Sequence, residues 1–385
     1  MEMHFEVCRM NILINALSAR LGGGQTYVKK LLEHIPDDFS GCIYVIAPED
    51  LQFTTIHSSV KRLPVPMLII TSVIFRTFWE ILFLPQLIRK LDISVLFCPG
   101  GLLNSSRLDH CKTVVTFQNM LPFDAIQLKK YGIGYSWLRN RLLRKKLLSS
   151  MRKADLVIFI SEYANQFIES IIGRPLKNSV VIPHGIDRIF HRNQNDFIKL
   201  PDTFIPEKYL LYVSALDVYK SQCEVVQAYS LLKERHNNLP PLFLIGYQFP
   251  KYTKQVRDII DKCNLKSHVT LINHMDYSIL PTVYKNSLVT IFMSQTENCP
   301  FILLEAMASG RPLVVSNMQP MPEFSRDTVL YADPRNPMEI ADKIETFLKD
   351  EDLRKEYAEK AKQLAYEYDW NYSATKTWQS IISLV

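Results

Sequence analysis

The stretch that decides the fold is ENCPFILLEAMASGRPLVVS, residues 297–316. It follows one short apolar run, Leu288–Phe292, and ends in another, Leu313–Val315, and both are typical of buried strands. Between them, Pro300 suits the first turn of a helix and Gly310 suits its C-terminal cap. The stretch therefore predicts a strand–helix–strand unit whose two strands run parallel in one sheet.

The same alternation of apolar runs and helical periodicity continues to both ends of the chain. The runs are rich in Val and Ile and lack strict alternation with polar residues, which is typical of strands buried on both faces of a parallel sheet. Helical patterns separate them, for example at 26–35, 163–172, 224–235, 253–263 and 337–348. The fold class is therefore α/β. We expect strands at 11–16, 42–47, 95–98, 113–117, 155–160, 179–182, 209–214, 242–245, 269–272, 288–292, 313–315 and 329–331.

These strands form two successive series, which predicts two doubly wound parallel-sheet domains. A length of 385 residues also suggests two domains. The first series stops at Pro183-His184-Gly185, and a polar stretch with two prolines follows. Ligands of such sheets bind outside the carboxyl ends of the strands, so two domains of this kind predict a cleft. We place the domains at 1–186 and 207–368, with a linker at 187–206 and a final helix at 369–385.

The composition is that of a globular protein, with 47% hydrophobic and 22% charged residues, and it excludes disordered, collagenous and coiled-coil chains. The seven cysteines form no Cys-x-x-Cys pair, which favours reduced thiols in a cytoplasm. The net charge of +6 is uneven, because residues 1–185 contain 22 Lys and Arg against 14 Asp and Glu, and residues 186–385 contain 23 against 25. Basicity along the whole chain would suggest a nucleic-acid partner. Basicity confined to one half indicates a particular anionic partner on that half, and we expect no nucleic acid to bind.

Residues 63–88 form the most apolar region of the chain. The longest run without a charge has 13 residues and contains Pro64 and Pro66, whereas a membrane-spanning helix needs about 20 apolar residues. Either a helix in the core of the first domain or peripheral membrane contact fits this region. Residues 1–10 have no apolar core, so we expect no signal peptide.

Residues 126–154 contain nine Lys and Arg residues and no Asp or Glu. Leucines at 138, 142, 143 and 147, with Met151, give the segment an apolar face. This pattern is typical of a helix on an anionic membrane surface, and a core-packed helix with a solvated basic face has the same pattern. A pyrophosphate-linked acceptor would be attracted by the same charges.

Two carboxylates in the deciding stretch can bind sugar hydroxyls. Glu297 lies just before the predicted helix and Glu305 lies within it. A carboxylate accepts hydrogen bonds from two vicinal hydroxyls, and a helix N-terminus offers free N–H groups and a positive dipole end to a diphosphate. By spacing alone, a solvated cap and an ordinary surface residue also explain these two acids.

Glu297 and Glu305, with residues 306–316 after them, resemble the E-x7-E signature of the retaining glycosyltransferases of family 4. The resemblance implies GT-B architecture: two Rossmann-like domains facing a cleft, with a C-terminal helix that crosses back to the first domain. It also implies that Glu297 lies by the donor sugar and diphosphate, and that Glu305 holds the nucleotide ribose. Backbone amides between the two acids are expected to contact sugar and phosphate.

The loop before the helix departs from the family pattern. Asn298, Cys299, Pro300 and Phe301 stand where the family usually has Gly-Phe-Gly-Leu, and Pro300 has no N–H to donate. We expect Asn298, Cys299 and Phe301 to bind the donor. Met275, in the loop after the strand at 269–272, is expected to take part in recognising the base.

The glycine loop and a hinge motif extend the resemblance over the first domain. Residues 21–27, LGGGQTY, resemble the loop in which Gly23 and Gly24 would let the backbone approach the donor. A plain strand–helix turn would carry the same glycines. In the hinge-like stretch 183–187, PHGID, we expect a structural role for His184.

Lys220 is expected to neutralise the donor diphosphate as the nucleotide leaves. Family members usually have Val-Gly-Arg-Leu before this lysine, whereas residues 213–216 are VSAL here, so Ala215 replaces the arginine. A solvated lysine at the start of a helix is the alternative interpretation.

After the strand at 113–117 many family members have His-Asp, and this chain has Gln118-Asn119. An amide binds sugar hydroxyls but cannot act as a general base. A retaining reaction in which the leaving phosphate deprotonates the acceptor needs no such base. The resemblance therefore places Gln118 with Lys220 and Glu297 among the catalytic residues, and Asn119 among the donor-binding ones. Ser161 resembles the family's strand-end serine and equally suits a helix N-cap.

We expect no metal and no cofactor. Residues 350–352, DED, spell D-x-D but lie between two helical patterns, which is typical of a helix start. The nine histidines show no metal-ligand spacing, and no G-x-G-x-x-G motif of a dinucleotide-dependent enzyme is present.

These features predict a retaining, metal-independent hexosyltransferase. Its donor would be a UDP- or GDP-sugar, and its acceptor a saccharide or a polyprenyl-pyrophosphate-linked saccharide in the synthesis of O-antigen, capsule or exopolysaccharide. We expect it in the cytoplasm, at the inner face of the inner membrane. Two alternatives stay open. One is a nucleotide-sugar epimerase or phosphorylase on the same fold. The other is a non-catalytic GT-B partner subunit, which Ala215 and Gln118 favour.

Overall fold

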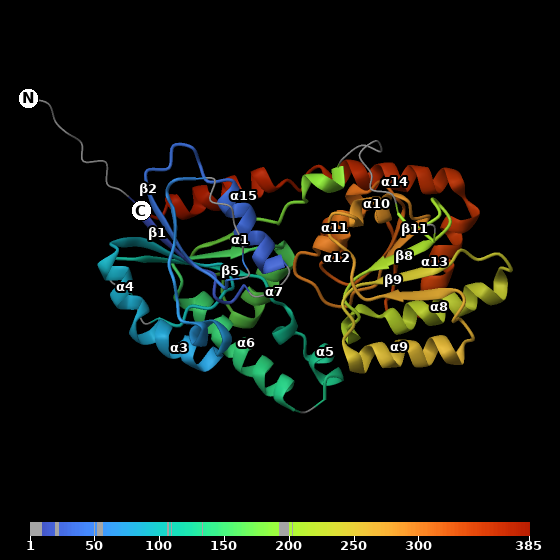
Figure 1. Ribbon diagram of the computed structural model, residues 1–385, viewed down its shortest axis with the longest axis horizontal. Helices are drawn as coiled ribbons and strands as arrows, with labels where there is room; N and C mark the ends of the chain where they lie inside the picture. Colours follow the sequence, from blue (N-terminus) through green and yellow to red (C-terminus); the bar gives the residue numbers. More distant parts are fainter. Residues whose placement is uncertain are drawn as a thin grey trace, which may run out of the picture. The chain divides into compact units, whose positions relative to one another are not determined.

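The computed structural model describes residues 10–385 except 20–22, 50, 52–56, 106–107, 109, 133, 192–199 and 202. Its internal contacts divide the chain into two compact units. The first contains the described residues up to 122, together with 138–184 and 370–385, and the second contains 123–137 and 185–369. Each unit is built around its own parallel sheet (Figure 1).

The first unit has a seven-stranded sheet in the order β3-β2-β1-β4-β5-β6-β7, and every neighbouring pair is parallel. Its strands are β1 (Met10–Asn15), β2 (Gly41–Ile46), β3 (Val60–Arg62), β4 (Ile93–Cys98), β5 (Lys112–Phe117), β6 (Leu156–Phe159) and β7 (Ser179–Val181). Its helices are α1 (Gly23–Glu33), α2 (Met67–Thr71), α3 (Val73–Leu82), α4 (Leu84–Lys90), α6 (Tyr135–Lys153, from residue 138 on), α7 (Glu162–Ile172) and α15 (Trp370–Ile382).

The second unit has a six-stranded parallel sheet in the order β10-β9-β8-β11-β12-β13. Its strands are β8 (Leu210–Val213), β9 (Leu242–Ile245), β10 (Val269–Ile272), β11 (Val289–Phe292), β12 (Leu313–Ser316) and β13 (Leu330–Ala332). Its helices are α5 (Ala125–Lys130), α8 (Gln222–Arg235), α9 (Pro250–Lys262), α10 (Leu280–Lys285), α11 (Phe301–Ala308), α12 (Met321–Ser325), α13 (Pro337–Lys349) and α14 (Glu351–Ala365), with a short 3-10 helix, η4 (Val218–Lys220).

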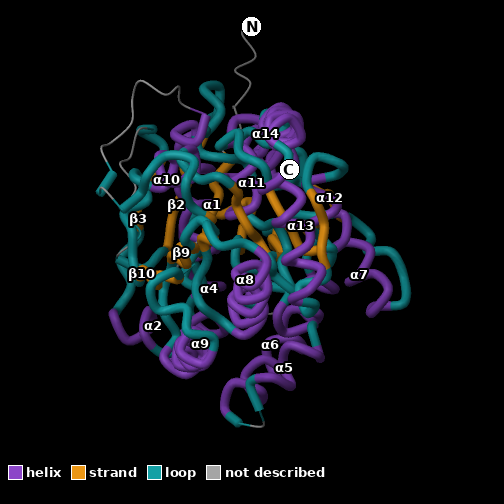
Figure 2. The backbone as a smooth tube through the Cα atoms, turned by 90° about the vertical axis from the view of Figure 1, so that its right-hand side faces the viewer, coloured by secondary structure: helices purple, strands orange, loops and turns teal. Residues whose placement is uncertain are grey.

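The apolar runs of the sequence are the sheet cores. Every residue of β6, β8, β9, β11 and β12 is buried, because helices cover both faces of a parallel sheet. Figure 2 shows the strands enclosed by helices. The predicted α/β class with two Rossmann-like sheets is thus confirmed, and each predicted strand is present, with small shifts at its ends.

Strand β3 was not predicted. It has only three residues, and Lys61 and Arg62 are exposed at the edge of the sheet. So short and polar a segment pairs because β2 offers it an open edge, not because of an apolar pattern of its own.

The interpretation of residues 63–88 as a core helix is wrong. The segment forms the three short helices α2, α3 and α4, and much of its apolar surface faces solvent. Pro66 precedes α2 and Pro85 lies in the first turn of α4. Because proline is favoured at a helix start, these two residues help to divide the region into separate helices.

The C-terminal helix α15 belongs to the first unit, as the GT-B architecture implies. Trp378 is fully buried there, and its indole N–H donates to the carbonyl oxygen of Leu31 in α1 at 3.0 Å. His184 packs between the rings of Tyr27 and Trp370, at 4.8 and 5.3 Å between centroids. Burial lowers the pKa of His184 to about 3, so the ring is neutral and its role here is packing.

Residues 123–137 pack with the second unit. The sequence suggests instead that they belong to the first domain, at 1–186. The side chains of Gln127 and Lys130 in α5, and of Tyr131 after it, bond to residues more than 80 positions later in the chain. A local pattern of polarity carries no information about such partners.

Candidate functional site

Two residues far apart in the sequence meet at the carboxyl ends of neighbouring strands. Lys220 lies in η4, after β8, and Glu297 lies after β11, which pairs with β8. The ammonium of Lys220 donates a hydrogen bond to Oε1 of Glu297. Parallel neighbours end at the same edge of a sheet, which is why these loops converge.

The backbone around Lys220 is fixed by buried hydrogen bonds. The hydroxyl of Tyr212 in β8 donates to the carbonyl oxygen of Lys220 at 2.6 Å and accepts from the N–H of Met293 at 3.2 Å. The ammonium also lies 4.9 Å from the ring centroid of Tyr219 and 5.4 Å from that of Phe292. Burial lowers the pKa of Lys220, but Glu297 and Tyr219 outweigh it and the pKa is raised. Lys220 is therefore a buried cation at neutral pH.

Helix α11 begins just after Glu297. Pro300 is its N-cap and not its first residue, and among the described residues no side chain caps its first turn. The N–H of Phe301 is bonded to the carbonyl oxygen of Cys299 at 3.0 Å, and the first regular helical bond runs from Leu304 to Pro300. The positive end of the helix dipole thus lies beside the Lys220–Glu297 pair. Gly310 follows the helix with φ +67°, as its predicted capping role requires.

Glu305 lies one turn into α11 and is buried. Its Oε1 accepts a hydrogen bond from the hydroxyl of Tyr277 at 2.7 Å. Burial raises the pKa of Glu305 to about 8, with Asp187 adding to the rise and the Tyr277 bond opposing it. The sequence did not predict a role for Tyr277. Its only signal was its position directly after the loop that contains Met275.

The remaining predicted donor-binding residues of the second unit lie at the start of α11 and in the loop after β10. Asn298 and Cys299 are buried, and Phe301 opens α11. Met275 is half-buried in the loop after β10, next to Asp276, whose carboxylate accepts from the N–H and hydroxyl of Ser278. The chain fold therefore gathers Lys220, Glu297, Glu305 and the Met275 loop around one end of the second sheet. Their roles in binding stay predictions.

Gln295 links this cluster to α5. Its amide N–H donates to Ser221 at 2.7 Å, and its side-chain oxygen accepts from Gln127 and Lys130, both at 2.9 Å. The hydroxyl of Tyr131 donates to Asp217 at 2.8 Å, and Asp217 caps η4. Lys130 thus brings a second cation to the loops around Lys220. The sequence offered no signal for it beyond the basicity of residues 126–154.

The predicted residues of the first unit lie close to one another. Gly23 and Gly24 open α1, and a Cβ at Gly24 would stand 3.7 Å from Oε1 of Gln118. The amide N–H of Gln118 donates to the carbonyl oxygen of Pro99 at 2.8 Å. Asn119 is exposed and accepts from the N–H of Leu121. Leu21 and Gly22 of the glycine loop, and residues 192–199 and 202 of the predicted linker, lie outside the described residues.

Two other motifs have local structural explanations. Ser161 is the N-cap of α7 and accepts from the N–H of Ala164 at 3.2 Å. Asp350 caps α14 in the same way and accepts from the N–H of Leu353 at 2.9 Å. Residues 350–352, DED, therefore form a helix start, as the sequence predicts. In the part of the chain that the structure describes, no group of three or more His, Cys, Asp or Glu side chains could hold a metal ion. No helix described is both long and apolar enough to cross a bilayer.

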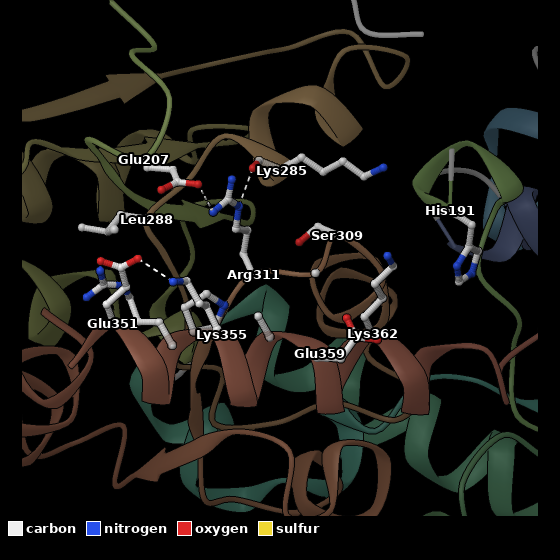
Figure 3. A pocket seen from close by; sticks show the side chains of 14 residues that line it. His191, Glu207, Lys285, Leu288, Ser309, Arg311, Glu351, Lys355, Glu359 and Lys362 are labelled. Carbon is white, nitrogen blue, oxygen red and sulfur yellow. Dashed lines mark hydrogen bonds and ion pairs between the residues drawn. The ribbon is translucent and has the colours of Figure 1, made fainter. Parts of the chain in front are cut away.

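A cavity of about 670 Å³ lies at the opposite end of α11 and does not include the Lys220–Glu297 pair. Figure 3 shows its charged side chains. Several of them pair with each other, since Arg311 bonds to Glu207 and Lys355 bonds to Glu351, each at 2.7 Å. This cavity is therefore a salt-linked groove beside α14, separate from the candidate site.

Comparison with known families decides the identity of the fold. Residues 197–364 match the family described as Glycosyl transferases group 1, and residues 21–189 match the Glycosyltransferase Family 4 family. The chain belongs to the GT-B glycosyltransferases. The Family 4 match covers the half that contains the seven-stranded sheet, and the group 1 match covers the half that contains the six-stranded sheet.

Curated relatives of this GT-B protein include enzymes of polysaccharide synthesis. The O-antigen chain mannosyltransferase B of Escherichia coli is 24% identical over 249 residues, which cover 62% of this chain and 63% of that protein. A glycogen synthase of Mycobacterium tuberculosis is 27% identical over 271 residues, covering 68% of this chain and 63% of that one. The match thus spans just under two thirds of each relative's length.

Solved GT-B structures match nearly the whole chain. HepE of Anabaena, in complex with UDP and glucose, covers 97% of this chain and all of its own, with a TM-score of 0.72 and 16% identity. A glycosyltransferase of Rickettsia africae covers 98% of this chain and 99% of its own, with a TM-score of 0.71 and 15% identity. These likenesses establish the fold.

Proposed function

We propose that this protein transfers a hexose from a nucleoside-diphosphate sugar to a saccharide or lipid-linked saccharide, with retention of configuration and without a metal ion. The observation that carries the proposal is the Lys220–Glu297 pair at the start of α11. A buried cation beside a helix N-terminus forms a site for a diphosphate. The family and the UDP-bound relative support a nucleotide-sugar donor.

In the proposed reaction, the bond between the anomeric carbon and the β-phosphate oxygen breaks while the acceptor oxygen bonds to the same face of the sugar. The proton of the acceptor hydroxyl passes to the leaving phosphate, so no protein base is needed. Lys220 would exchange its bond to Glu297 for one to the diphosphate, and its raised pKa keeps it charged for that purpose. Glu305 would accept from the ribose hydroxyls.

We further place the reaction in the cytoplasm and in surface polysaccharide synthesis, as O-antigen, capsule or exopolysaccharide. Nucleotide sugars are the donors there, and the relative in Escherichia coli is named for O-antigen chains.

Calorimetry with UDP, GDP, UDP-glucose and GDP-mannose tests the donor site directly. We expect one of the two nucleotide series to bind, and Glu297→Gln to retain nucleotide binding while losing transfer. The anomeric configuration of the product, measured by NMR, tests retention. If the folded protein binds neither series, the alternative of a non-catalytic partner subunit, which Ala215 favours, replaces this proposal. If the donor is isomerised or cleaved by phosphate when no acceptor is present, the protein is the epimerase or the phosphorylase of the alternative.

A further inference from the structure

Helix α3 of the first unit has the reverse of the usual polarity. Its charged residues Arg76 and Glu80 are only 7% and 4% exposed, whereas Ile74 and Phe78 are 68% and 59% exposed. A surface helix normally buries its apolar face and exposes its charges. The opposite arrangement presents an apolar helix face to the surroundings.

The reversed orientation is held by hydrogen bonds of the charged residues. The guanidinium of Arg76 donates to the carbonyl oxygen of Leu17 at 2.6 Å. The carboxylate of Glu80 accepts from Asn15 at 2.7 Å and from Asn104. Rotating α3 to hide its apolar side chains would break these bonds and leave the buried side chain of Asn15 without its partner. The exposed apolar face is therefore a fixed feature of the unit.

The neighbouring helices extend this surface, which we call the apolar face. Its exposed members come from α2, α3 and the start of α4: Met67, Leu68, Val73, Ile74, Phe75, Phe78, Ile81, Leu82 and Phe83. A groove of about 390 Å³ opens beside them, lined in part by Leu63, Val65, Trp79 and Leu87. Contiguous apolar surface of this kind marks an interaction site, unlike scattered single residues.

Basic side chains lie on two elements next to the apolar face, α4 and α6. Within 63–90 the one acidic residue, Glu80, is buried, and Arg89 and Lys90 are exposed. Helix α6 lies next to α3, because the ammonium of Lys146 donates to Asn104, the same residue that binds Glu80. Residues 138–153 of α6 contain no acid, and their exposed basic side chains are Arg139, Arg141, Lys145, Lys146, Arg152 and Lys153.

We propose that the apolar face docks on an anionic lipid bilayer, with α3 at the level of the acyl chains and the basic side chains of α6 among the headgroups. An apolar surface bordered by positive charge fits this occupant. A second copy of the chain fits poorly, because a two-fold contact through this face would bring two basic α6 helices together. The inference does not rest on the proposed reaction, since it concerns only the first unit.

Co-sedimentation of the full chain with vesicles tests the inference. We expect binding to vesicles of 70% phosphatidylcholine and 30% phosphatidylglycerol, weakened by salt and absent with phosphatidylcholine alone. The double variant Ile74→Asp/Phe78→Asp should bind at least about tenfold more weakly, because two exposed apolar side chains would no longer enter the bilayer. The matched control Ile205→Asp, at an exposed apolar residue of the second unit, should bind like the wild type.

Quenching of tryptophan fluorescence by brominated lipid gives a second readout that needs no charged variant. Trp79 lines the groove, whereas Trp370 and Trp378 are buried. We expect quenching in the wild type and in Trp137→Phe, and its loss in Trp79→Phe. Wild type that stays in the supernatant at low salt, or a double variant that binds unchanged, would overturn the inference. So would a wild-type dimer that the double variant dissociates.

Discussion

Glu305 is the residue whose environment departs furthest from that of an ordinary carboxylate in the candidate site. It is buried in α11, and its partner is the hydroxyl of Tyr277. Tyr277 donates to one of the carboxyl oxygens that the proposed function assigns to the ribose. Donor binding would therefore require Tyr277 to turn away or to share that oxygen.

The raised pKa of Glu305 predicts a dependence of stability on pH. The folded-state pKa of about 8 lies above the ordinary value of 4.5, so the folded protein holds this proton more tightly than the unfolded chain does. The contribution to stability is complete below pH 4.5 and is lost as pH rises through 8, with a slope of at most about 1.4 kcal/mol per pH unit. Urea unfolding between pH 4.5 and 9 should show this loss for the wild type and not for Glu305→Gln. The control Glu234→Gln, at an exposed residue, should keep the wild-type profile.

Lys220 and Glu305 should differ in what their removal impairs. Glu305→Ala should weaken nucleotide binding by about 10- to 100-fold, since it deletes the hydrogen bonds that its carboxyl oxygens would accept from the ribose. Lys220→Ala should weaken binding less and lower the transfer rate by about 100-fold or more, because its charge is needed as the diphosphate leaves. Calorimetry and initial rates on the same preparations separate these effects. The reverse order in binding would show that the ribose contact is misassigned.

At the scale of elements, the candidate site depends on where strands end. Strands β8 and β11 are parallel neighbours, so the loops that follow them carry Lys220 and Glu297 to one place. A third element, α5, reaches the same loops through Gln295. The site is thus assembled from segments beginning near residues 125, 218 and 295.

Replacing Gln295 should release α5 from these loops. Gln295→Leu keeps the approximate size but removes the bonds to Ser221, Gln127 and Lys130, and it leaves the buried amide of Gln127 without this partner. We expect hydrogen exchange of the amides of residues 125–131 to accelerate at least about tenfold, as one lost buried partner costs about 1–3 kcal/mol. Gln363→Leu, at an exposed position of α14, is the control and should leave these amides unchanged. Unchanged exchange in Gln295→Leu would mean that other contacts hold α5.

At the scale of the whole molecule, neither compact unit is a continuous stretch of chain. The first unit is completed by residues 370–385, and the second by residues 123–137. Helix α15 therefore closes the core of a sheet whose last strand ended near residue 181.

Removing the anchor of α15 should destabilise the first unit. Trp378 is fully buried against α1, so Trp378→Ala should lower the free energy of unfolding of that unit by about 3–5 kcal/mol. Trp79 and Trp370, which also lie in this unit, report its unfolding by fluorescence. Tyr372→Ala, at an exposed position of the same helix, should change little. A cost below about 1 kcal/mol for Trp378→Ala would contradict the anchoring role.

The sequence by itself determined the parts of this protein that depend on local pattern. Val- and Ile-rich runs identify the strands of both sheets, because a strand buried on both faces needs apolar side chains in succession. The positions of Pro300 and Gly310 bound α11 for reasons internal to the helix. The family resemblance implied that Lys220 and Glu297 serve one donor site, and the structure brings them together because β8 and β11 are parallel neighbours.

Only the tertiary structure decided which surface each segment faces. The polarity of residues 63–88 fits either a core helix or peripheral membrane contact. The buried partners of Arg76 and Glu80 fix α3 with its apolar side chains exposed. The Tyr277–Glu305 bond and the attachment of α5 to Gln295 join residues tens to hundreds of positions apart. Such contacts follow from the three-dimensional positions of donors and acceptors, which a one-dimensional pattern of polarity does not contain.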